Sequence, residues 1–188
     1  DGLEQMSHLR LHNGTIWRWN RPLIGFDYDG IPHLRIEHRV VPGGPTIVDA
    51  IANAALFFGL MQVLIDAGEP AEPHIPFATA RDNFYAAARY GLDARITWYD
   101  GEKGTLRSLL LQQLLPQARS GLESLEIDRN DIEHYLGVIE ARLQSGQTGS
   151  AWQRAWVAKH GDDMAAMTAA YLKRQDAGQP VHEWDLRP

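Results

Sequence analysis

Residues 34–50 have the sequence LRIEHRVVPGGPTIVDA, and the residue pattern changes once within this stretch. Apolar and polar residues alternate from Leu34 to Val40, which is the period of a strand with one face in a core. The run of proline and glycine at 42–45 then ends the strand, and Thr46 with Asp49 three residues later is typical of a capped helix start. We therefore expect the chain to pass from sheet to helix near residue 44.

The sequence before this boundary predicts antiparallel strands. Alternation extends from Ser7, and residues 15–19 are rich in β-branched and aromatic side chains. Asp27-Tyr28-Asp29-Gly30 is a turn signal between two such runs. We expect residues 15–26 and 31–41 to form an antiparallel hairpin within a sheet that covers residues 7–41.

The sequence after the boundary predicts helices and one short hairpin. We expect helices near 46–67, 78–90, 104–120, 129–145, 149–160 and 162–176. Ile96-Thr97-Trp98-Tyr99, followed by Asp100-Gly101, predicts the hairpin. The fold class is therefore α+β, and we expect one domain over 1–188 with a sheet portion at 1–44 and a helical portion at 45–188.

Charge and composition exclude several classes of protein. The 188 residues are 44% hydrophobic and 22% charged, as in ordinary globular domains. The net charge of −6 opposes binding to nucleic acid or to anionic lipid, so we expect neither as a partner. The chain has no cysteine, which excludes disulfides, thiolate metal sites and a cysteine nucleophile.

The sequence carries no sign of a membrane span or a secretion signal. The most apolar stretch, 47–65, is interrupted by polar residues and predicts a buried helix. The first residues lack a basic stretch followed by an apolar run, so we expect a cytoplasmic protein.

One face of the predicted strand at 34–41 carries groups suited to phosphate chemistry. Strand alternation places Arg35, Glu37 and Arg39 on the same side. The carboxylate could hold a divalent cation, and an arginine two residues away could reach a metal-bound phosphate. On pattern alone, a solvated sheet surface explains the same residues and is the commoner case.

The segment 12–22 also combines residues typical of binding sites. It contains two tryptophans, two arginines and two asparagines, and Arg21 lies at a strand end before Pro22. The alternative is that Trp17 and Trp19 pack in the core while the arginines are solvated.

Two further patterns are weaker indications of a site. His8 and His12 have a metal-ligand spacing only in a helix, whereas the alternation favours a strand. The loop from Gly146 to Ala151 resembles a phosphate loop without its lysine, and a plain helix connection explains it better.

Four motifs together resemble the glutamate-cysteine ligase superfamily, and within it the bacterial carboxylate-amine ligases, whose catalytic domain is similar to glutamine synthetase. They occur in the family's order: residues 13–22 ending in Arg-Pro, the strand with Glu37-His38-Arg39, the helix ending Ala88-Arg89-Tyr90-Gly91-Leu92, and the element 146–154. Together they span about residues 8–155.

The resemblance implies a role for each matching residue. Glu37 would be a magnesium ligand, and Arg39 a catalytic contact to the nucleotide phosphate. Arg21 would be a second catalytic arginine near the substrate or phosphate. Arg35 would add a weaker contact to the nucleotide, and His12 is a weaker candidate for the same face.

The resemblance also implies a reaction. A substrate carboxylate attacks the γ-phosphoryl group of Mg-ATP, and an amine then displaces phosphate from the acyl phosphate. In this family an amino-terminal half supplies further metal ligands and strands. We therefore expect this chain to be a carboxy-terminal portion, inactive alone, that associates with the missing half or with a second copy.

A second hypothesis comes from another class of protein. Tryptophan and arginine are also enriched at protein interfaces, so the chain could be a non-catalytic, helix-rich interaction or oligomerisation module. Binding of Mg-ATP through Glu37 separates the two, because an interface would be indifferent to Glu37→Gln.

Overall fold

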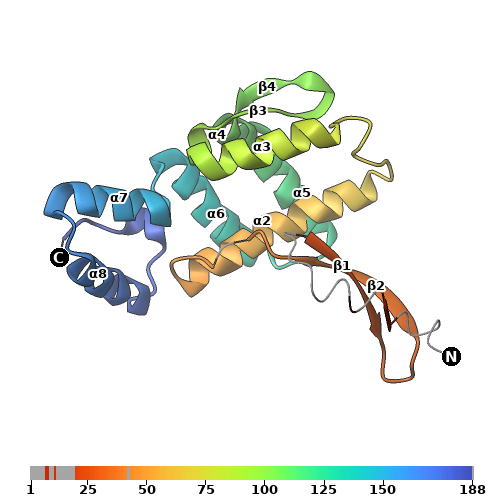
Figure 1. Cartoon of the computed structure of the whole chain (residues 1–188), viewed down its shortest axis with the longest axis horizontal. Helices are drawn as coiled ribbons and strands as arrows, with labels where there is room; N and C mark the ends of the chain where they lie inside the picture. The colour runs from red at the N-terminus through yellow and green to blue at the C-terminus, as the bar shows by residue number, and fades with distance from the viewer. Residues whose placement is uncertain (1–6, 9–10, 12–19, 42, 188) are drawn as a thin grey trace. The chain divides into compact units, whose positions relative to one another are not determined.

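The computed structural model of the protein describes residues 7–8, 11, 20–41 and 43–187. The chain divides into two compact units, residues 1–42 and residues 43–188 (Figure 1). The first unit contains a β-hairpin, and the second is mostly helical.

The hairpin consists of β1 (Asn20–Phe26) and β2 (Pro32–His38), which pair antiparallel. Asp27 accepts a hydrogen bond from the Gly30 amide at 2.9 Å, and Gly30 has a φ of 82° that favours glycine. The predicted hairpin and its turn are confirmed, with β2 shorter than expected. The predicted strand at residues 15–19 lies outside the described residues.

The prediction of a strand from Ser7 is wrong where the structure describes this segment. Ser7, His8 and Leu11 have helical backbone. The alternation in this segment is clearest over the four residues 9–12, and a run this short does not distinguish the two periods.

The apolar face of β2 differs from the expectation of a core face. The side chains of Leu34 and Ile36 are 82% and 74% exposed. The alternation of residues shows which face of a strand is apolar but not whether another element covers it. The described strands of this unit form a two-stranded hairpin, which has no second layer of its own to bury Leu34 and Ile36.

The second unit is built from helices and one short antiparallel hairpin. Its elements are α2 (Ile47–Asp66), α3 (Phe77–Tyr90), η1 (Gly91–Asp93), β3 (Arg95–Thr97), η2 (Tyr99–Gly101), β4 (Lys103–Thr105), α4 (Leu106–Leu109), η3 (Leu110–Leu114), α5 (Leu115–Ser124), α6 (Arg129–Ser145), α7 (Gly149–His160), α8 (Met164–Asp176) and η4 (Val181–Glu183).

The predicted helices agree with these bounds within two residues, apart from 104–120. That segment begins as a strand and continues from Leu106 to Ser124 through α4, η3 and α5, of which η3 is a π-helix. The run of leucines predicted a helix here but did not indicate that its residues 110–114 would form a π-helix, which is wider than an α-helix.

Local side-chain contacts explain where the helices begin and end. The hydroxyl of Thr46 accepts the Asp49 amide at the start of α2, as the sequence predicted, and Thr148 does the same for Ala151 at α7. Gly146 ends α6 with a φ of 72°. The segment 146–151 is therefore a connection between α6 and α7, which is the plainer of its two interpretations.

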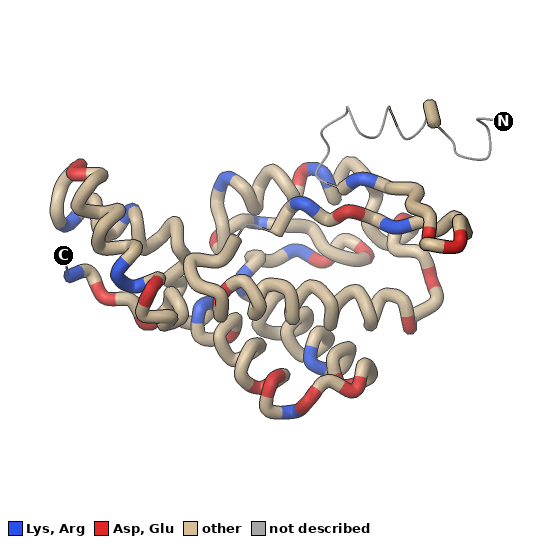
Figure 2. The backbone as a smooth tube through the Cα atoms, turned by 90° about the horizontal axis from the view of Figure 1, so that it is seen from below, with Lys and Arg blue, Asp and Glu red and all other residues tan. Residues whose placement is uncertain are grey.

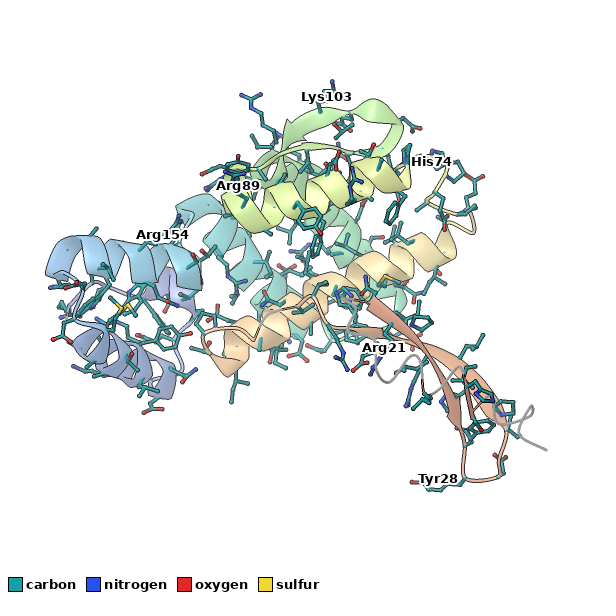
Figure 3. All side chains as sticks on the ribbon, in the orientation of Figure 1. Arg21, Tyr28, His74, Arg89, Lys103 and Arg154 are labelled. Carbon is teal, nitrogen blue, oxygen red and sulfur yellow. The ribbon has the colours of Figure 1, made fainter. Side chains whose placement is uncertain are left out.

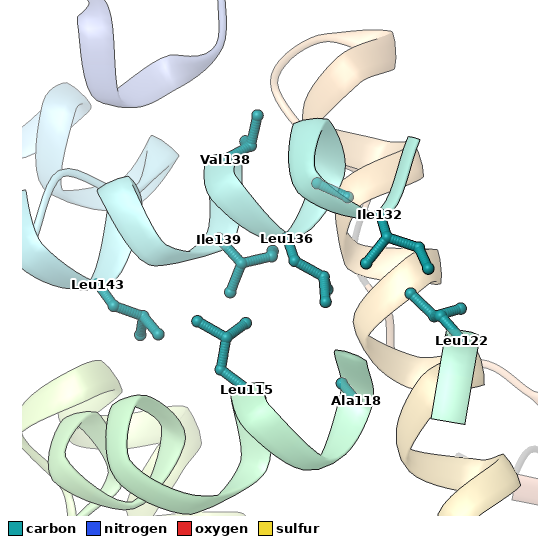
Figure 4. Close-up of a cluster of buried hydrophobic side chains, with 9 residues drawn as sticks. Leu115, Ala118, Leu122, Ile132, Leu136, Val138, Ile139 and Leu143 are labelled. Atoms are coloured by element: carbon teal, nitrogen blue, oxygen red, sulfur yellow. The ribbon is translucent and has the colours of Figure 1, made fainter. Parts of the chain in front are cut away.

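The core lies where α2, α5 and α6 meet (Figure 4). Leucine, isoleucine, valine and alanine side chains fill it: Ala52, Leu115, Ala118, Leu122, Ile132, Leu136, Val138, Ile139 and Leu143. Helices α2 and α5 approach closely because their contact is made by glycine. A Cβ on Gly121 would lie 2.0 Å from the carbonyl oxygen of Gly59, so no larger residue fits without moving a helix.

A second cluster closes the carboxy-terminal part of this unit. The rings of Trp152 and Trp184 meet edge-on with centroids 5.3 Å apart, and Trp156 is buried beside them. The Trp152 indole donates to the carbonyl of Asp185 at 2.7 Å, which holds the segment after η4 against α7.

A buried ion pair joins three elements of the helical unit. The Asp49 carboxylate on α2 is fully buried and accepts a hydrogen bond from Arg142 on α6 at 2.7 Å. It also accepts the backbone amide of Val181 in η4 and the hydroxyl of Thr46. Every oxygen of this carboxylate therefore has a partner.

One face of α2 remains exposed, which differs from the fully buried helix expected. The exposed large apolar residues of α2 are Ile47, Ile51, Phe58, Met61, Leu64 and Ile65, and all but Leu64 follow one another at the helical spacings of three, four or seven positions. By length and composition alone, α2 is also apolar enough to cross a membrane, with 17% of it buried within the structure. Its opposite face carries the Asp49 ion pair and the Gly59 contact, so this helix packs on protein along one side.

Candidate functional site

The β1–β2 hairpin places Arg21 directly opposite Glu37. The Nε and Nη2 atoms of Arg21 lie 2.9 and 2.6 Å from Oε2 of Glu37. Cross-strand partners in an antiparallel pair project to the same side of the sheet, which explains the contact. Figure 3 labels Arg21 on β1.

The other oxygen of Glu37 is also occupied by a guanidinium group. Nη2 of Arg39, one residue beyond β2, lies 3.0 Å from Oε1 of Glu37. The three side chains are half-buried, with 14%, 34% and 28% of Arg21, Glu37 and Arg39 exposed. The structure therefore brings together three of the residues that the sequence placed in a site, and we call Arg21, Glu37 and Arg39 the arginine–glutamate cluster.

Arg35 occupies the same side of β2, two residues before Glu37. Arg35 and Arg39 precede and follow Glu37 by two residues in the sequence, and Figure 2 marks the basic and acidic positions along the backbone. The Arg35 side chain is exposed and has no ion-pair partner within the described part of the chain. With Arg35, the described residues of this face include three guanidinium groups around one carboxylate.

The two arginines keep Glu37 in its charged form. The hydrogen bond from Arg39 is the largest influence, and with the hydrogen bond and charge of Arg21 it lowers the pKa of the Glu37 carboxyl below its ordinary value, although partial desolvation opposes this. An ionised carboxylate aligns the two guanidinium groups beside one another. The cluster is therefore preorganised for an anion with several oxygens.

The residues of the hairpin fit a bound magnesium ion only in part. Magnesium at a nucleotide commonly takes one or two protein carboxylates and completes its shell with phosphate oxygens and water. Glu37 can supply one such ligand if it exchanges an arginine for the ion. Among the residues that the structure describes, no three His, Asp or Glu side chains gather into a metal cluster.

The guanidinium groups of the cluster have the chemistry that phosphate binding requires. Arg21 and Arg39 each present a planar fork, and both forks converge on one carboxylate. A phosphoryl group has the charge and the oxygen spacing to replace that carboxylate on either guanidinium. Binding of a phosphate here would require the Glu37 carboxylate to release one of the two guanidinium groups.

Several residues that the sequence indicated as functional are not part of the arginine–glutamate cluster as the structure describes it. His12, Trp17 and Trp19 fall outside the described residues. Arg89 at the end of α3 lies 5.4 Å from the ring of Tyr90, which it covers as a cation–π pair. In Figure 3, Arg89 and Arg154 belong to α3 and α7 of the helical unit.

Sequence reasoning missed two polar contacts that organise the helical unit. The Asn83 side chain accepts the Thr97 amide at 2.9 Å and donates to its carbonyl at 2.6 Å, which fixes β3 on α3. The Asp49–Arg142 pair joins α2 to α6. A lone aspartate within an apolar helix was the available signal, and the sequence analysis used it only as a cap residue.

Comparison with known proteins shows the family. The family model described as glutamate-cysteine ligase family 2 (GCS2) matches residues 18–173 of the chain. This match covers most of the chain and includes the whole arginine–glutamate cluster. The chain therefore belongs to glutamate-cysteine ligase family 2.

One curated relative agrees with this assignment. The chain is 30% identical over 155 residues to a protein of Frankia alni named "Putative glutamate-cysteine ligase 2-1". The alignment covers 78% of this chain and 37% of the relative, so the chain spans just over a third of that protein's length. No solved structure matches the chain.

Proposed function

We propose that this chain is part of an ATP-dependent carboxylate-amine ligase of the glutamate-cysteine ligase type. The single observation that carries the proposal is the arginine–glutamate cluster, in which two guanidinium groups converge on Glu37. Family membership supports a ligase, and the charge of the cluster suits the phosphate groups of a nucleotide.

The proposed reaction forms an amide bond in two steps. An oxygen of the substrate carboxylate bonds to the γ-phosphorus of ATP while the bond to the β-phosphate oxygen breaks, which releases ADP and leaves an acyl phosphate. The substrate amine then bonds to the acyl carbon, the carbon–oxygen bond to phosphate breaks, and the amine loses a proton. Atoms and charge balance with ADP, phosphate and the amide as products.

The chain's own residues would stabilise charge during these steps. Arg21 and Arg39 would contact the transferring phosphoryl group and later the departing phosphate, while Arg35 would add a weaker contact from the same side. Glu37 would hold both arginines before the nucleotide binds and serve as one magnesium ligand afterwards. Magnesium, when bound, neutralises part of the phosphate charge.

The complete catalytic centre would include residues beyond this chain. One carboxylate is a small share of the ligands that a magnesium-dependent ligase needs, and the chain spans 37% of the relative from Frankia alni. We propose that a preceding part of a longer enzyme supplies further carboxylates and the neighbouring strands, and that the 188 residues alone are inactive. We also propose a cytoplasmic location, which suits a chain without cysteine.

Calorimetric titration of Mg-ATP into the longer parent enzyme tests the proposal. We expect saturable binding by the parent and loss of that binding in the Glu37→Gln variant, because a neutral amide in place of the carboxylate would neither ligate magnesium nor align the arginines. Glu123→Gln is the matched control, since Glu123 is an exposed glutamate on α5 of the helical unit. Equal binding of Mg-ATP by the two variants would show that Glu37 does not contribute to the nucleotide site. No binding by the parent enzyme would contradict the proposal that it uses ATP.

An interaction module is the second candidate, and the exposed face of α2 favours it. The exposed large apolar residues of α2 are Ile47, Ile51, Phe58, Met61, Leu64 and Ile65, and exposed apolar areas of this kind often mark contacts. This candidate includes association with a second copy of the chain. Sedimentation of the 188 residues against a Phe58→Glu variant tests it, because a dimer formed through α2 would dissociate in the variant.

A further inference from the structure

The helical unit contains a cleft that the arginine–glutamate cluster does not use. Its volume is about 690 Å³, within the range of small-molecule sites. Three segments line it: the end of α2, the loop from Trp98 to Glu102, and the junction of η3 with α5. The lining residues that the structure describes all belong to the helical unit.

The floor of the cleft is apolar and one wall is aromatic. Leu60, Val63 and Leu114 supply apolar surface. The rings of Trp98 and Tyr99 stack with centroids 5.1 Å apart, and the ring of His74 stacks on Tyr99 at 5.6 Å. This stack positions flat aromatic surface at the cleft, where an apolar ring or a cation can pack against it.

The charged groups at the cleft are carboxylates, and glutamine side chains add further hydrogen-bonding groups. Asp100 and Glu102 are the charged residues that line it, and Gln113 and Gln117 lie across from them on η3 and α5. The Gln113 amide donates to both Glu102 oxygens at 2.9 and 3.0 Å, which orients the carboxylate. Lys103 lines a separate depression with Arg95 on the β3–β4 hairpin, and Figure 3 shows it pointing away from the helices.

Two backbone features around the cleft are typical of functional sites. The π-helical segment η3 supplies Gln113 and Leu114, and such insertions occur frequently at binding sites. Asp100 has a φ of 55°, an uncommon conformation for a residue other than glycine. Its side chain contacts His74 at 3.1 Å, and its amide donates to the His74 carbonyl, so contacts to the α2–α3 loop hold this conformation.

We propose that this cleft binds a small organic amine that carries a flat apolar ring. The ring would lie on the leucine and valine floor beside the Trp98–Tyr99 stack. The ammonium group has three donors and no acceptor, which matches the carboxylate of Glu102 and the amide oxygens of Gln113 and Gln117. A negatively charged ligand would face Asp100 and Glu102, and the lining residues that the structure describes include no lysine or arginine to pair with it.

The inference is independent of the proposed ligase function. It concerns a cleft formed within residues 43–188, whereas the arginine–glutamate cluster belongs to residues 1–42. Failure of the proposed nucleotide site would therefore not affect the proposal that the cleft binds an amine.

Titration with two matched probes tests the proposal on the 188-residue chain. Tryptamine and indole-3-propionate share an indole ring and carry opposite charges. We expect tryptamine to bind saturably, with NMR shifts at the Trp98 indole and the Gln113 and Gln117 side-chain amides, and indole-3-propionate to bind at least about tenfold more weakly. Equal affinity of the two probes, or no saturable binding of tryptamine, would overturn the proposal.

Variants locate the binding within the cleft. Glu102→Gln should weaken tryptamine about tenfold, and Gln117→Arg, which adds a cation at an exposed position of α5, should abolish binding without disturbing the core. Glu123→Gln, on the same helix and outside the cleft, should bind as the parent does. Unchanged affinity in both Glu102→Gln and Gln117→Arg would show that the amine binds elsewhere.

Discussion

The hairpin unit and the helical unit each place arginine against a carboxylate, and the surroundings of the two contacts differ. Asp49 is fully buried, and its oxygens are satisfied by Arg142, by Thr46 and by the backbone of Val181. Glu37 is one third exposed, and its two oxygens are held by two half-buried arginines. A buried carboxylate whose oxygens all accept hydrogen bonds, such as Asp49, indicates a structural contact. A partly exposed carboxylate between two arginines, such as Glu37, indicates a contact in which an arginine can exchange its partner.

Breaking the buried pair should give the largest effect on stability. Asp49→Ala leaves the Arg142 guanidinium buried beside an empty position and removes the acceptor for the Val181 amide. We expect a loss of about 3–5 kcal/mol in the free energy of unfolding, measured by urea denaturation of the chain. Asp66→Ala, at an exposed aspartate on the same helix, should change it by about 0.5 kcal/mol or less. Similar losses in the two variants would contradict a special role for the buried pair.

Removing an arginine from the hairpin should affect turnover far more than stability. We expect Arg39→Ala to lower kcat of the longer enzyme about 10²–10³-fold, the usual cost of deleting one charge-stabilising donor. The contact is partly exposed, so unfolding should change by about 1 kcal/mol or less. Steady-state kinetics and urea denaturation of the same preparation measure kcat and the free energy of unfolding. A variant with a normal kcat and a large loss of stability would show that the Arg39 contact is structural.

The glycine contact between α2 and α5 should be intermediate in cost. Gly121→Val would place side-chain atoms against the Gly59 backbone, where even a Cβ lies only 2.0 Å from the carbonyl oxygen. We expect a loss of about 1–3 kcal/mol by urea denaturation. Gly137→Ala on α6, which has open space around it, should be neutral or slightly stabilising. A neutral Gly121→Val would mean that the two helices are not closely packed.

The smallest expected effect is on the titration of Glu37. The hydrogen bond from Arg39 and the hydrogen bond and charge of Arg21 lower its pKa, so Arg39→Ala and Arg21→Ala should each raise that pKa toward its ordinary value. A depressed carboxyl pKa stabilises the fold above the unfolded pKa, and this contribution is lost as the pH falls through the folded pKa. Side-chain carboxyl NMR measures the pKa of Glu37 in both variants, and an unchanged value in either one would contradict the contact of that arginine with Glu37.

Sequence reasoning predicted local structure well and long-range contacts poorly. Thr46 and Asp49 marked the start of α2, and the alternation at 34–40 marked β2, because both signals depend on neighbours in the chain. The π-helical widening at η3 was missed, since the leucine run is compatible with either helix. The helical backbone at Ser7 was missed because the alternating run there was too short.

The candidate site shows the same limit. The spacing of Arg35, Glu37 and Arg39 placed them on one face, and the structure brings Glu37 into contact with Arg39. The contact of Arg21 with Glu37 depends on the hairpin register, which the turn at 27–30 determines and which the sequence indicated only approximately. The roles of these residues in catalysis remain predictions.

By itself, the sequence determined the α+β class, the boundary between sheet and helices, the start of α2 and the set of charged residues on β2, because these depend on spacing within one element. Only the tertiary structure decided that Asp49 meets Arg142 across 93 residues, that α2 keeps an exposed apolar face and that Trp98 lines a cleft with α5. Such contacts join residues distant in the chain, and no local pattern specifies which surfaces will meet when the elements pack.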